Sequence, residues 1–415
     1  MAKATTALEN ALAQLEEAAS IAGLEAHVHE FLKRPMRELT VRIPLKMDNG
    51  SVRVIEAYRF HHNWANGPIR GGTRFHKDET PDDVRALSMW MTIKNACNNI
   101  PNGGGKGGIA VDPATLSTNE LERLCRGYIR AISAITGPWM DFPGADIGTD
   151  PRTQSWMLDE WEAMHQRLEP AAISGKAMPL GGSAGRALAT SRGAQYATRA
   201  VAASLGKPMS SLRAIVQGFG KVGANLVSLY EEDQVTICGV SDVNGGIYNA
   251  DGLDVKDIFA WFEEKGTLAG YPRAKAVTNA ELLGQDCDVL APCAVQSVIT
   301  VDNAPQIKAW AVMEGANGPV TVDAEKILRE RKIIDCPDVY TNSGGTQVAH
   351  FERIQNLNND CWTEEFVNKK LEGVFLDVFN EIYSVSNQKG ITMRMACWVK
   401  ALNHTVTSMK WRGWI

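Results

Sequence analysis

The spacing of apolar residues predicts a helix with a lysine on its apolar face in the segment TPDDVRALSMWMTIKNACNN. Thr80 is typical of a helix N-cap, and the proline that follows it suits the first helical position. Val84, Leu87 and Met91 then recur at helical spacing. Lys94 continues the same stripe. Such a lysine either extends its stem to water or places a cation in a dry pocket that receives an anion.

Two further segments predict amphipathic helices. In STNELERLCRGYIRAI, Ser117 and Glu120 have the spacing of a capping box, and apolar residues recur on one face as far as Ile132. We interpret this helix as scaffold. Residues 1–20 carry glutamates inside an apolar pattern, which favours an amphipathic first helix over a secretory signal.

The second half of the chain alternates strand-like apolar runs with helical stretches, as a doubly wound parallel sheet requires. The candidate strands are RAIVQ (213–217), VTICGV (235–240), CDVLAPC (287–293), AWAVMEG (309–315) and DVYTNSGG (338–345). The first run leads into Gly218-x-Gly220-x-x-Gly223, and Asp242 follows the second run. This order predicts a dinucleotide site, because the glycines allow a tight turn against the pyrophosphate, the helix N-terminus binds phosphate and the acid binds the ribose.

A glycine-rich stretch in the first third, NNIPNGGGKGGIAVDP (98–113), surrounds one lysine, Lys106. It is predicted to be either a phosphate-binding loop or a tight loop that presents Lys106 to a substrate. Because the dinucleotide already has a site near Gly218, we favour the second interpretation. Arg70 and Lys94 lie close by in sequence, so the three cations predict an anion pocket.

The segment GPWMDFPGADIGTD is rich in glycine and proline and is predicted to be a loop. It holds two acids, Asp141 and Asp146. From these residues alone, both acids are interpreted as surface turn residues.

Composition excludes several functional classes. The chain has 415 residues and 44% hydrophobic content, which is enough for two or three domains. A net charge of −5 gives no nucleic-acid footprint, and no apolar run reaches membrane-spanning length. The eight cysteines lack CxxC pairs and metal-ligand spacing. We therefore expect buried, reduced thiols, no metal and a cytoplasmic location.

Several motifs in fixed order resemble the glutamate dehydrogenase family, which includes the leucine, phenylalanine and valine dehydrogenases. They are GPIRGGTRFH, MTIKNACNNIPNGGGKGGIAVDP, FPGADIGTD, GGSAGRALAT, GFGKVG, SDVNGGIYN, EGANGP and NSGGTQVAHFERIQN. The resemblance implies a two-domain α/β fold with the active site in the intervening cleft, usually assembled as a homohexamer. The implied parts are an α/β substrate and oligomerisation domain (1–185), a Rossmann dinucleotide-binding domain (186–345) and C-terminal helices that return to the substrate domain (346–415).

The resemblance also implies roles for individual residues. Lys106 matches the catalytic lysine, which as a neutral amine would activate the water that attacks an imine, and Asp146 matches the aspartate that handles protons at the amino nitrogen. Burial and the nearby cations Lys94 and Arg70 would favour the neutral amine. The implied substrate-binding residues are Arg70, Gly72, Lys94, which binds the α-carboxylate, and Ala349. The implied cofactor-binding residues are Thr190, Gly218, Phe219, Gly220, Lys221, Val222, Gly223, Asp242, Asn317 and Asn342.

Two positions depart from the glutamate-specific pattern. Arg70 stands where those members have lysine and Ala349 where they have serine, whereas members for branched-chain and aromatic substrates have apolar residues at both. Arginine binds a carboxylate bidentately, so L-glutamate is the simplest substrate, while a longer diacid or a polar or apolar amino acid stays open. In a further departure, LATSRG stands where the family reads close to EATGRG, with no assigned effect.

The reaction implied is the reversible NAD(P)-dependent oxidative deamination of an amino acid to its 2-oxo acid and ammonia. Asp242 favours NAD because its charge repels a 2′-phosphate, but NADP stays possible because related NADP enzymes carry an acid in a similar turn. A catalytically silent nucleotide-binding paralogue is a third hypothesis. Retention of Lys94, Lys106 and Asp146 opposes it.

Overall fold

The computed structural model describes residues 6–415 and divides them into two compact units. The first unit holds the described residues up to Arg186 with Thr346–Val367 and Cys397–Ile415, and the second holds Ala187–Gly345 and Asn368–Ala396. We expected all of 346–415 to return to the first unit, but Asn368–Ala396 belongs to the second. Two ion pairs join this segment to the rest of the second unit, because Glu372 pairs with Arg199 and Arg394 pairs with Glu314.

The first unit is built on a five-stranded mixed sheet. In spatial order its strands are β1 (Arg37–Lys46), β2 (Val52–Asn63), β4 (Gly103–Ile109), β3 (Ile69–Phe75) and β5 (Asp141–Ala145). The pairs β1–β2 and β2–β4 are antiparallel, whereas β3 is parallel to both β4 and β5. The strand β4 therefore lies in the centre of the sheet.

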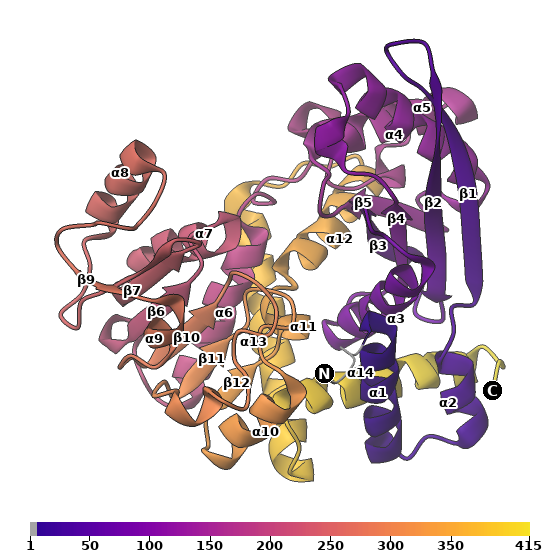
Figure 1. Cartoon of the computed structure of the whole chain (residues 1–415). Helices are drawn as coiled ribbons and strands as arrows, with labels where there is room; N and C mark the ends of the chain where they lie inside the picture. Colours follow the sequence, from indigo (N-terminus) through magenta and orange to yellow (C-terminus); the bar gives the residue numbers. More distant parts are fainter. Residues whose placement is uncertain (1–5) are drawn as a thin grey trace. The chain divides into compact units, whose positions relative to one another are not determined.

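Helices cover both faces of this sheet (Figure 1). The helix α3 (Pro81–Cys97) packs on one face against β2 and β4, while α4 (Thr118–Ile132) and α5 (Pro151–His165) cover the other. Side chains of β2 alternate between the faces, so Ala57 joins the core under α4, whereas Tyr58 joins Val84 of α3. The unit also contains α1 (Ala7–Ala22), α2 (Ala26–Leu32) and most of α12 (Gly344–Leu357) and α14 (Met393–Trp411).

The glycine-rich stretch around Lys106 is a strand, β4, and the prediction of a tight loop is wrong. The strand is buried along its whole length, and none of its glycines has a positive φ. Its glycines are required by close neighbours, because a Cβ built at Gly104 would lie 2.1 Å from the Thr92 backbone nitrogen. The helix α3 thus packs directly on the backbone of β4. Asp141 likewise lies in a strand and is fully buried, not in a surface turn.

The second unit contains a seven-stranded sheet. In spatial order its strands are β12 (Ile334–Cys336), β11 (Ala311–Met313), β10 (Val289–Pro292), β6 (Arg213–Gln217), β7 (Thr236–Asp242), β8 (Gly245–Tyr248) and β9 (Lys275–Val277). The first five are parallel, and β8 and β9 form an antiparallel edge. This is the predicted doubly wound sheet, with the strand order reversing between β6 and β10, where such sheets bind ligands.

One predicted strand of this unit is wrong. Residues 338–345 form the short helix α11 (Asp338–Thr341) and the start of α12, and the last parallel strand is β12, just before them. Pro337 precedes the helix, and the Asp338 carboxylate accepts a hydrogen bond from the Val339 N–H, which suits an acid at a helix start.

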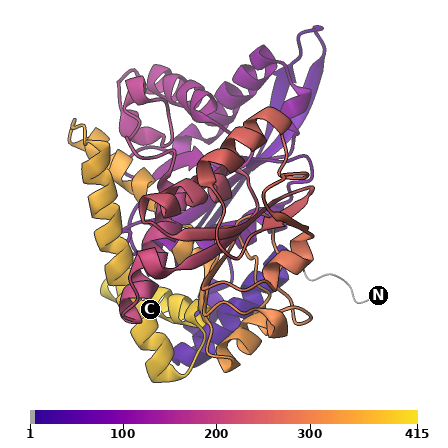
Figure 2. The same ribbon diagram turned by 90° about the vertical axis from the view of Figure 1, so that its left-hand side faces the viewer.

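The remaining helices of this unit flank the sheet. They are α6 (Ala189–Ser204), α7 (Lys221–Glu232), α8 (Val255–Lys265), α9 (Asn279–Leu283), α10 (Val322–Glu330) and most of α13 (Glu364–Lys389). The helices α7 and α8 are neighbours, as both ribbon views show (Figures 1 and 2).

The predicted helix starts are confirmed. Thr80 caps α3 by accepting from the Asp83 N–H, and Ser117 and Glu120 form the capping box of α4. The first helix begins at Ala7, and residues 1–5 of that predicted helix lie outside the described residues. Within 6–415, no helix is long and apolar enough to cross a membrane.

All eight cysteines are free thiols. Seven are buried as expected, but Cys361 is exposed.

Candidate active site

Three of the predicted site residues meet on one face of the first unit's sheet. Lys106 projects from the centre of β4, and Asp146 directly follows β5. The Lys106 Nζ donates to the Asp146 Oδ2 at 2.5 Å, and the two side chains are only 6% and 24% exposed. Gly72 permits this approach, because a Cβ there would lie 2.6 Å from the same oxygen. The structure therefore brings together Lys106, Asp146 and Gly72.

The carboxylate of Asp146 is held in its charged form. Burial alone would raise the pKa of Asp146. The charge and hydrogen bond of Lys106, together with the hydrogen bond from the Ile147 N–H, outweigh this effect, so the pKa lies below its usual value. The Asp146 N–H donates to the Thr149 hydroxyl, which fixes the turn after β5. We expected cations to dominate the surroundings of Lys106, whereas its direct partner is this carboxylate. The pair thus places an amine and a carboxylate in direct hydrogen-bond contact.

Arg70 carries a buried guanidinium group. It projects from β3 and is 4% exposed, and among residues 6–415 its side chain has no ion pair or hydrogen bond. The group lies 5.7 Å from the centre of the Phe142 ring, and both terminal nitrogens are 2.8 Å from where a Cβ of Gly144 would stand. Burial, with the charges of Arg186 and Arg59, lowers the pKa of Arg70 to about 9, so it stays charged at neutral pH.

Two basic residues near Arg70 were missed by the sequence analysis. Arg353, on α12, lies 5.0 Å from the Phe142 ring centre, so both guanidinium groups contact one ring. Its Nε donates to the Pro138 carbonyl, and it has no carboxylate partner within the described chain. His350 is buried, and burial with the charges of Arg353 and Arg70 lowers its pKa to about 4. These residues stand inside the motif NSGGTQVAHFERIQN, but nothing in that motif indicates that they are buried beside Arg70.

The buried acid closest in sequence to these bases is already neutralised. Glu352 pairs with Lys176 at 2.8 Å and with Arg186 at 3.3 Å, and it accepts the Gly175 N–H at 2.9 Å. The charge of Glu352 is thus balanced by Lys176 and Arg186, and Glu352 forms no ion pair with Arg70 or Arg353. Within residues 6–415 the positive charge around Phe142 therefore lacks a paired carboxylate, which is the arrangement expected of an anion-binding pocket.

The structure places the other two predicted substrate residues on helices. Lys94 is half-buried in the last turn of α3, and its carbonyl accepts from the Asn98 side chain. Ala349 is fully buried on α12, one residue before His350.

The glycine turn of the second unit has the geometry of a dinucleotide site. Gly218 has a φ of 100°, which favours glycine, and a Cβ at Gly223 would lie 1.8 Å from the Gly218 oxygen. Gly220 is different, because no atom lies within 4 Å of its missing Cβ. It forms the N-cap of α7 without a side-chain cap. The turn thus leaves open space at a helix N-terminus, where phosphate binds.

The residues between these glycines line the same turn. Phe219 is buried, with its ring 5.0 Å from those of Phe259 and Phe262 on α8. Lys221 is exposed in the first turn of α7, and the Val222 carbonyl accepts from the Ser191 hydroxyl on α6. Phe219 therefore anchors the turn, while Lys221 is available to a ligand.

Asp242 ends β7, as predicted, and its carboxylate is already engaged by its own chain. One oxygen accepts from the Asn244 N–H at 2.7 Å, and the other accepts from the Thr267 hydroxyl at 2.7 Å and the Leu268 N–H at 2.6 Å. A carboxylate has about four acceptor sites, so room for a ribose hydroxyl remains.

Asn317 and Asn342 come together beside the glycine turn. The Asn342 Nδ2 donates to the Asn317 Oδ1 at 2.8 Å and to the Ala316 carbonyl at 3.1 Å. Gly315 opens this loop, and a Cβ there would lie 3.5 Å from a Val222 methyl group. Thr190 approaches from α6, with its hydroxyl 3.0 Å from where a Cβ of Gly345 would stand. All ten predicted cofactor residues thus lie in one unit.

Buried ion pairs support the loop that carries Asn317. Arg394 pairs with Glu314, directly before the loop, at 2.5 Å, and with Asp338 at 2.6 Å. The Asp338 carboxylate also accepts from the Gly318 N–H at 2.9 Å. Arg394 therefore fixes both ends of the loop through these acids, a contribution that no local sequence signal indicated.

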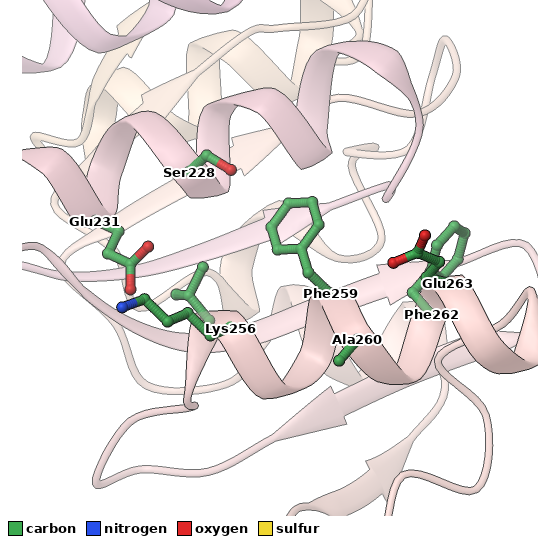
Figure 3. Close-up of a pocket in the computed structure, with 8 residues that line it drawn as sticks. Ser228, Glu231, Lys256, Phe259, Ala260, Phe262 and Glu263 are labelled. Carbon is green, nitrogen blue, oxygen red and sulfur yellow. The ribbon is translucent and has the colours of Figure 1, made fainter.

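A separate cavity of about 680 Å³ lies between α7 and α8. Figure 3 shows the Phe259 ring pointing from α8 toward α7 and the Lys256 side chain extending toward Glu231. None of the predicted site residues lines it. Within the described chain, no cluster of three or more His, Cys, Asp or Glu side chains could hold a metal ion.

Comparison with known families matches nearly the whole chain. Residues 181–413 match the family described as Glutamate/Leucine/Phenylalanine/Valine dehydrogenase. Residues 35–163 match the Glu/Leu/Phe/Val dehydrogenase, dimerisation domain.

Individual relatives agree with this result. A catabolic NAD-specific glutamate dehydrogenase of Bacillus subtilis (strain 168) is 42% identical over 401 residues, covering 97% of this chain and 94% of the relative. An NAD-specific glutamate dehydrogenase of Staphylococcus aureus (strain COL) is 40% identical, covering 96% of both chains.

Solved structures show the same two-domain α/β architecture. Glutamate dehydrogenase from Peptoniphilus asaccharolyticus has a TM-score of 0.90 at 36% identity, covering 99% of this chain and 100% of that one. A hetero-hexameric glutamate dehydrogenase from Thermus thermophilus, in a leucine-bound form, has a TM-score of 0.91 at 33% identity, covering 100% and 98%.

Proposed function

The chain belongs to the Glutamate/Leucine/Phenylalanine/Valine dehydrogenase family, and we propose that it catalyses the reversible NAD-dependent oxidative deamination of L-glutamate to 2-oxoglutarate and ammonia. The family supports the reaction type. The observation that carries the choice of glutamate is the buried guanidinium of Arg70, which has no counterion among residues 6–415.

A distal carboxylate would complete this pocket. A buried unpaired charge is costly, and an arginine fork binds a carboxylate through two parallel hydrogen bonds. Arg353 adds a second cation beside the same Phe142 ring, which an uncharged side chain would leave uncompensated. Lys94 is proposed to bind the α-carboxylate, which substrates of both the acidic and the apolar members share.

Lys106 and Asp146 are proposed to perform the proton transfers. The substrate amino group must lose a proton before hydride leaves Cα, and the Asp146 carboxylate accepts it. Water then attacks the resulting imine, and the neutral Lys106 amine takes the proton that this water releases. Asp146 returns its proton to the nitrogen, the C–N bond breaks to release ammonia, and the added hydroxyl loses its proton to solvent as it becomes the carbonyl of the 2-oxo acid. The 2.5 Å contact between the two groups supports this exchange.

The dinucleotide is proposed to bind at the glycine turn of the second unit. When bound, NAD supplies the acceptor for the hydride at its nicotinamide ring. The residues present fit this group, because Gly220 leaves open space at the N-terminus of α7 and Asp242 stands at the end of the next strand. Asn317 and Asn342 would hold the nicotinamide end. The two curated relatives described above are NAD-specific, which agrees with the charge of Asp242.

We further propose that residues 1–185 bind the amino acid and mediate assembly, and that 186–345 bind the dinucleotide. The match to a dimerisation domain and the hetero-hexameric relative support a hexamer. A cytoplasmic location would keep the eight free thiols reduced.

The test is a panel of L-glutamate, L-2-aminoadipate, L-leucine and L-phenylalanine, each with NAD and NADP, followed by the absorbance of the reduced nicotinamide. The reverse reaction is measured with the matching 2-oxo acids and ammonia. We expect the highest kcat/KM for glutamate with NAD. A preference for leucine or phenylalanine would reject the acidic-substrate assignment, and inactivity on every substrate would indicate a silent paralogue.

A further inference from the structure

Glu79 is a buried carboxyl group that the proposed reaction does not use. It follows β3 and directly precedes Thr80, the N-cap of α3. Its side chain has no exposed surface, and neither carboxyl oxygen has a hydrogen-bond partner in the part of the chain that the structure describes. Buried polar groups are nearly always hydrogen-bonded, so an orphan carboxyl needs an explanation.

The side chain of Glu79 packs against β4 at Gly108. A Cβ built at Gly108 would lie 2.7 Å from the Glu79 Cγ and 3.1 Å from its Oε1. Gly108 stands two residues after Lys106 on β4, so both positions face the same side of the sheet. The carboxyl therefore lies on the face of the sheet that carries the Lys106–Asp146 pair, at the next position along the strand.

Charged and titratable groups surround Glu79 from every element packed against it. They are Tyr58 and its partner Glu56 on β2, Arg74 on β3, Lys106 on β4, Asp146 after β5 and Asp83 on α3. The Arg74 Nε lies 3.3 Å from a Glu79 oxygen without hydrogen-bond geometry. Burial is the largest influence and raises the pKa of Glu79 to about 7, although Arg74 and Lys106 oppose it. Glu79 therefore changes charge near neutral pH.

We propose that Glu79 is a positioning residue for the reaction, which sets the protonation of Lys106 through its own charge. This inference rests on the proposed function, because it assigns Lys106 the role of base. An ionised Glu79 favours the ammonium form of Lys106, whereas a protonated Glu79 does not. The activity profile is therefore expected to contain an ionisation that belongs to Glu79.

The test is the pH dependence of kcat/KM for glutamate oxidation in the wild type, Glu79→Gln and Glu79→Asp. Glutamine removes the charge and keeps the shape of the side chain. Lys106 then loses a nearby anion, so it becomes a neutral base at lower pH, and the acid limb should move down by about half a pH unit or more. Glu79→Asp retains a titrating carboxyl and should restore a profile with the wild-type number of ionisations.

Asp82→Asn is the matched control. It removes one carboxylate three residues away, on the exposed side of the same helix start, and should leave the profile unchanged. An unchanged profile in Glu79→Gln, or an equal shift in Asp82→Asn, would overturn the proposal. If the wild type does not oxidise glutamate at all, the proposed function fails, which is a separate outcome.

Unfolding measurements test the titration without activity. Because the folded-state pKa of Glu79 is raised to about 7, the stability that its bound proton contributes is present at low pH and is lost as pH rises through neutrality. The free energy of unfolding of the wild type should therefore fall relative to that of Glu79→Gln when the pH is raised from 5 to 8, two values on either side of the Glu79 pKa. A stability difference that is independent of pH would show that Glu79 does not titrate and would overturn the proposal.

Discussion

The strand β4 and the turn between β6 and α7 are both rich in glycine, but their glycines meet different steric demands. In β4 every glycine has an ordinary backbone conformation, and neighbouring atoms exclude a side chain, as at Gly104. In the turn, Gly218 needs its positive φ, whereas Gly220 has open space around it. The glycines of β4 are surrounded by other atoms of the protein, whereas the turn leaves space at Gly220 that a ligand could fill. A glycine cluster therefore indicates close approach without telling what approaches.

Removing the anion receptor beside β4 should have a large effect. Arg70→Leu leaves a distal carboxylate in a partly dry pocket without its partner, which costs about 2–5 kcal/mol of binding. The Michaelis constant for glutamate should rise steeply, while that for NAD should stay near the wild-type value. Steady-state kinetics on glutamate and leucine measure both.

Arg37→Leu is a suitable control, because Arg37 is a surface arginine at the start of β1 and has no place in the proposed site. If Arg70→Leu uses glutamate as well as the wild type does, Arg70 does not bind the distal carboxylate.

Adding one methyl group to each glycine segment should separate the two roles. Gly104→Ala forces a Cβ to within 2.1 Å of the α3 backbone, and overpacking of this kind costs about 1–3 kcal/mol of folding stability. At Gly220 no atom lies within 4 Å of the position that a Cβ would take, so Gly220→Ala should change the free energy of unfolding by less than about 0.5 kcal/mol. Its methyl group should instead weaken NADH binding. Urea unfolding and NADH titration of both variants measure the contrast, and equal destabilisation would contradict it.

The smallest expected effect concerns the choice between NAD and NADP. Asp242→Asn removes the charge that repels a 2′-phosphate, so the preference for NAD should fall by about tenfold, equivalent to about 1.4 kcal/mol. Asp251→Asn, an exposed acid in the following loop, is the control. The ratio of kcat/KM for the two cofactors is the measurement. A wild-type enzyme that prefers NADP would reject the role of Asp242.

Features set by local sequence could be predicted, and features set by distant contacts could not. The cap at Thr80 and the positions of Gly218 and Asp242 depend on residues close in the chain, so pattern alone located them. The strand β4 was missed because glycines show no apolar alternation, and its burial depends on α3 and β2. Residues 338–345 have strand-like composition, yet Pro337 and the Asp338 carboxylate start a helix.

The candidate site shows the same division. The sequence placed Lys106 and Asp146 through their motifs, and the structure adds that they touch. Arg353 and Glu79 could not be recognised, because a charged residue in sequence gives no sign of whether burial will leave it without a partner. Their importance depends on segments far apart in the chain, such as Pro138 beside Arg353 and Gly108 beside Glu79.

The central claim is that β4 supplies the chemistry and the turn at Gly218–Gly223 binds the dinucleotide. Lys106→Ala tests it most directly, with turnover of glutamate and the Kd for NADH measured on the same purified protein. Turnover should fall by at least about a hundredfold, as loss of an acid–base group predicts, while NADH binding stays at the wild-type value. Wild-type turnover, or loss of NADH binding together with turnover, would contradict the account.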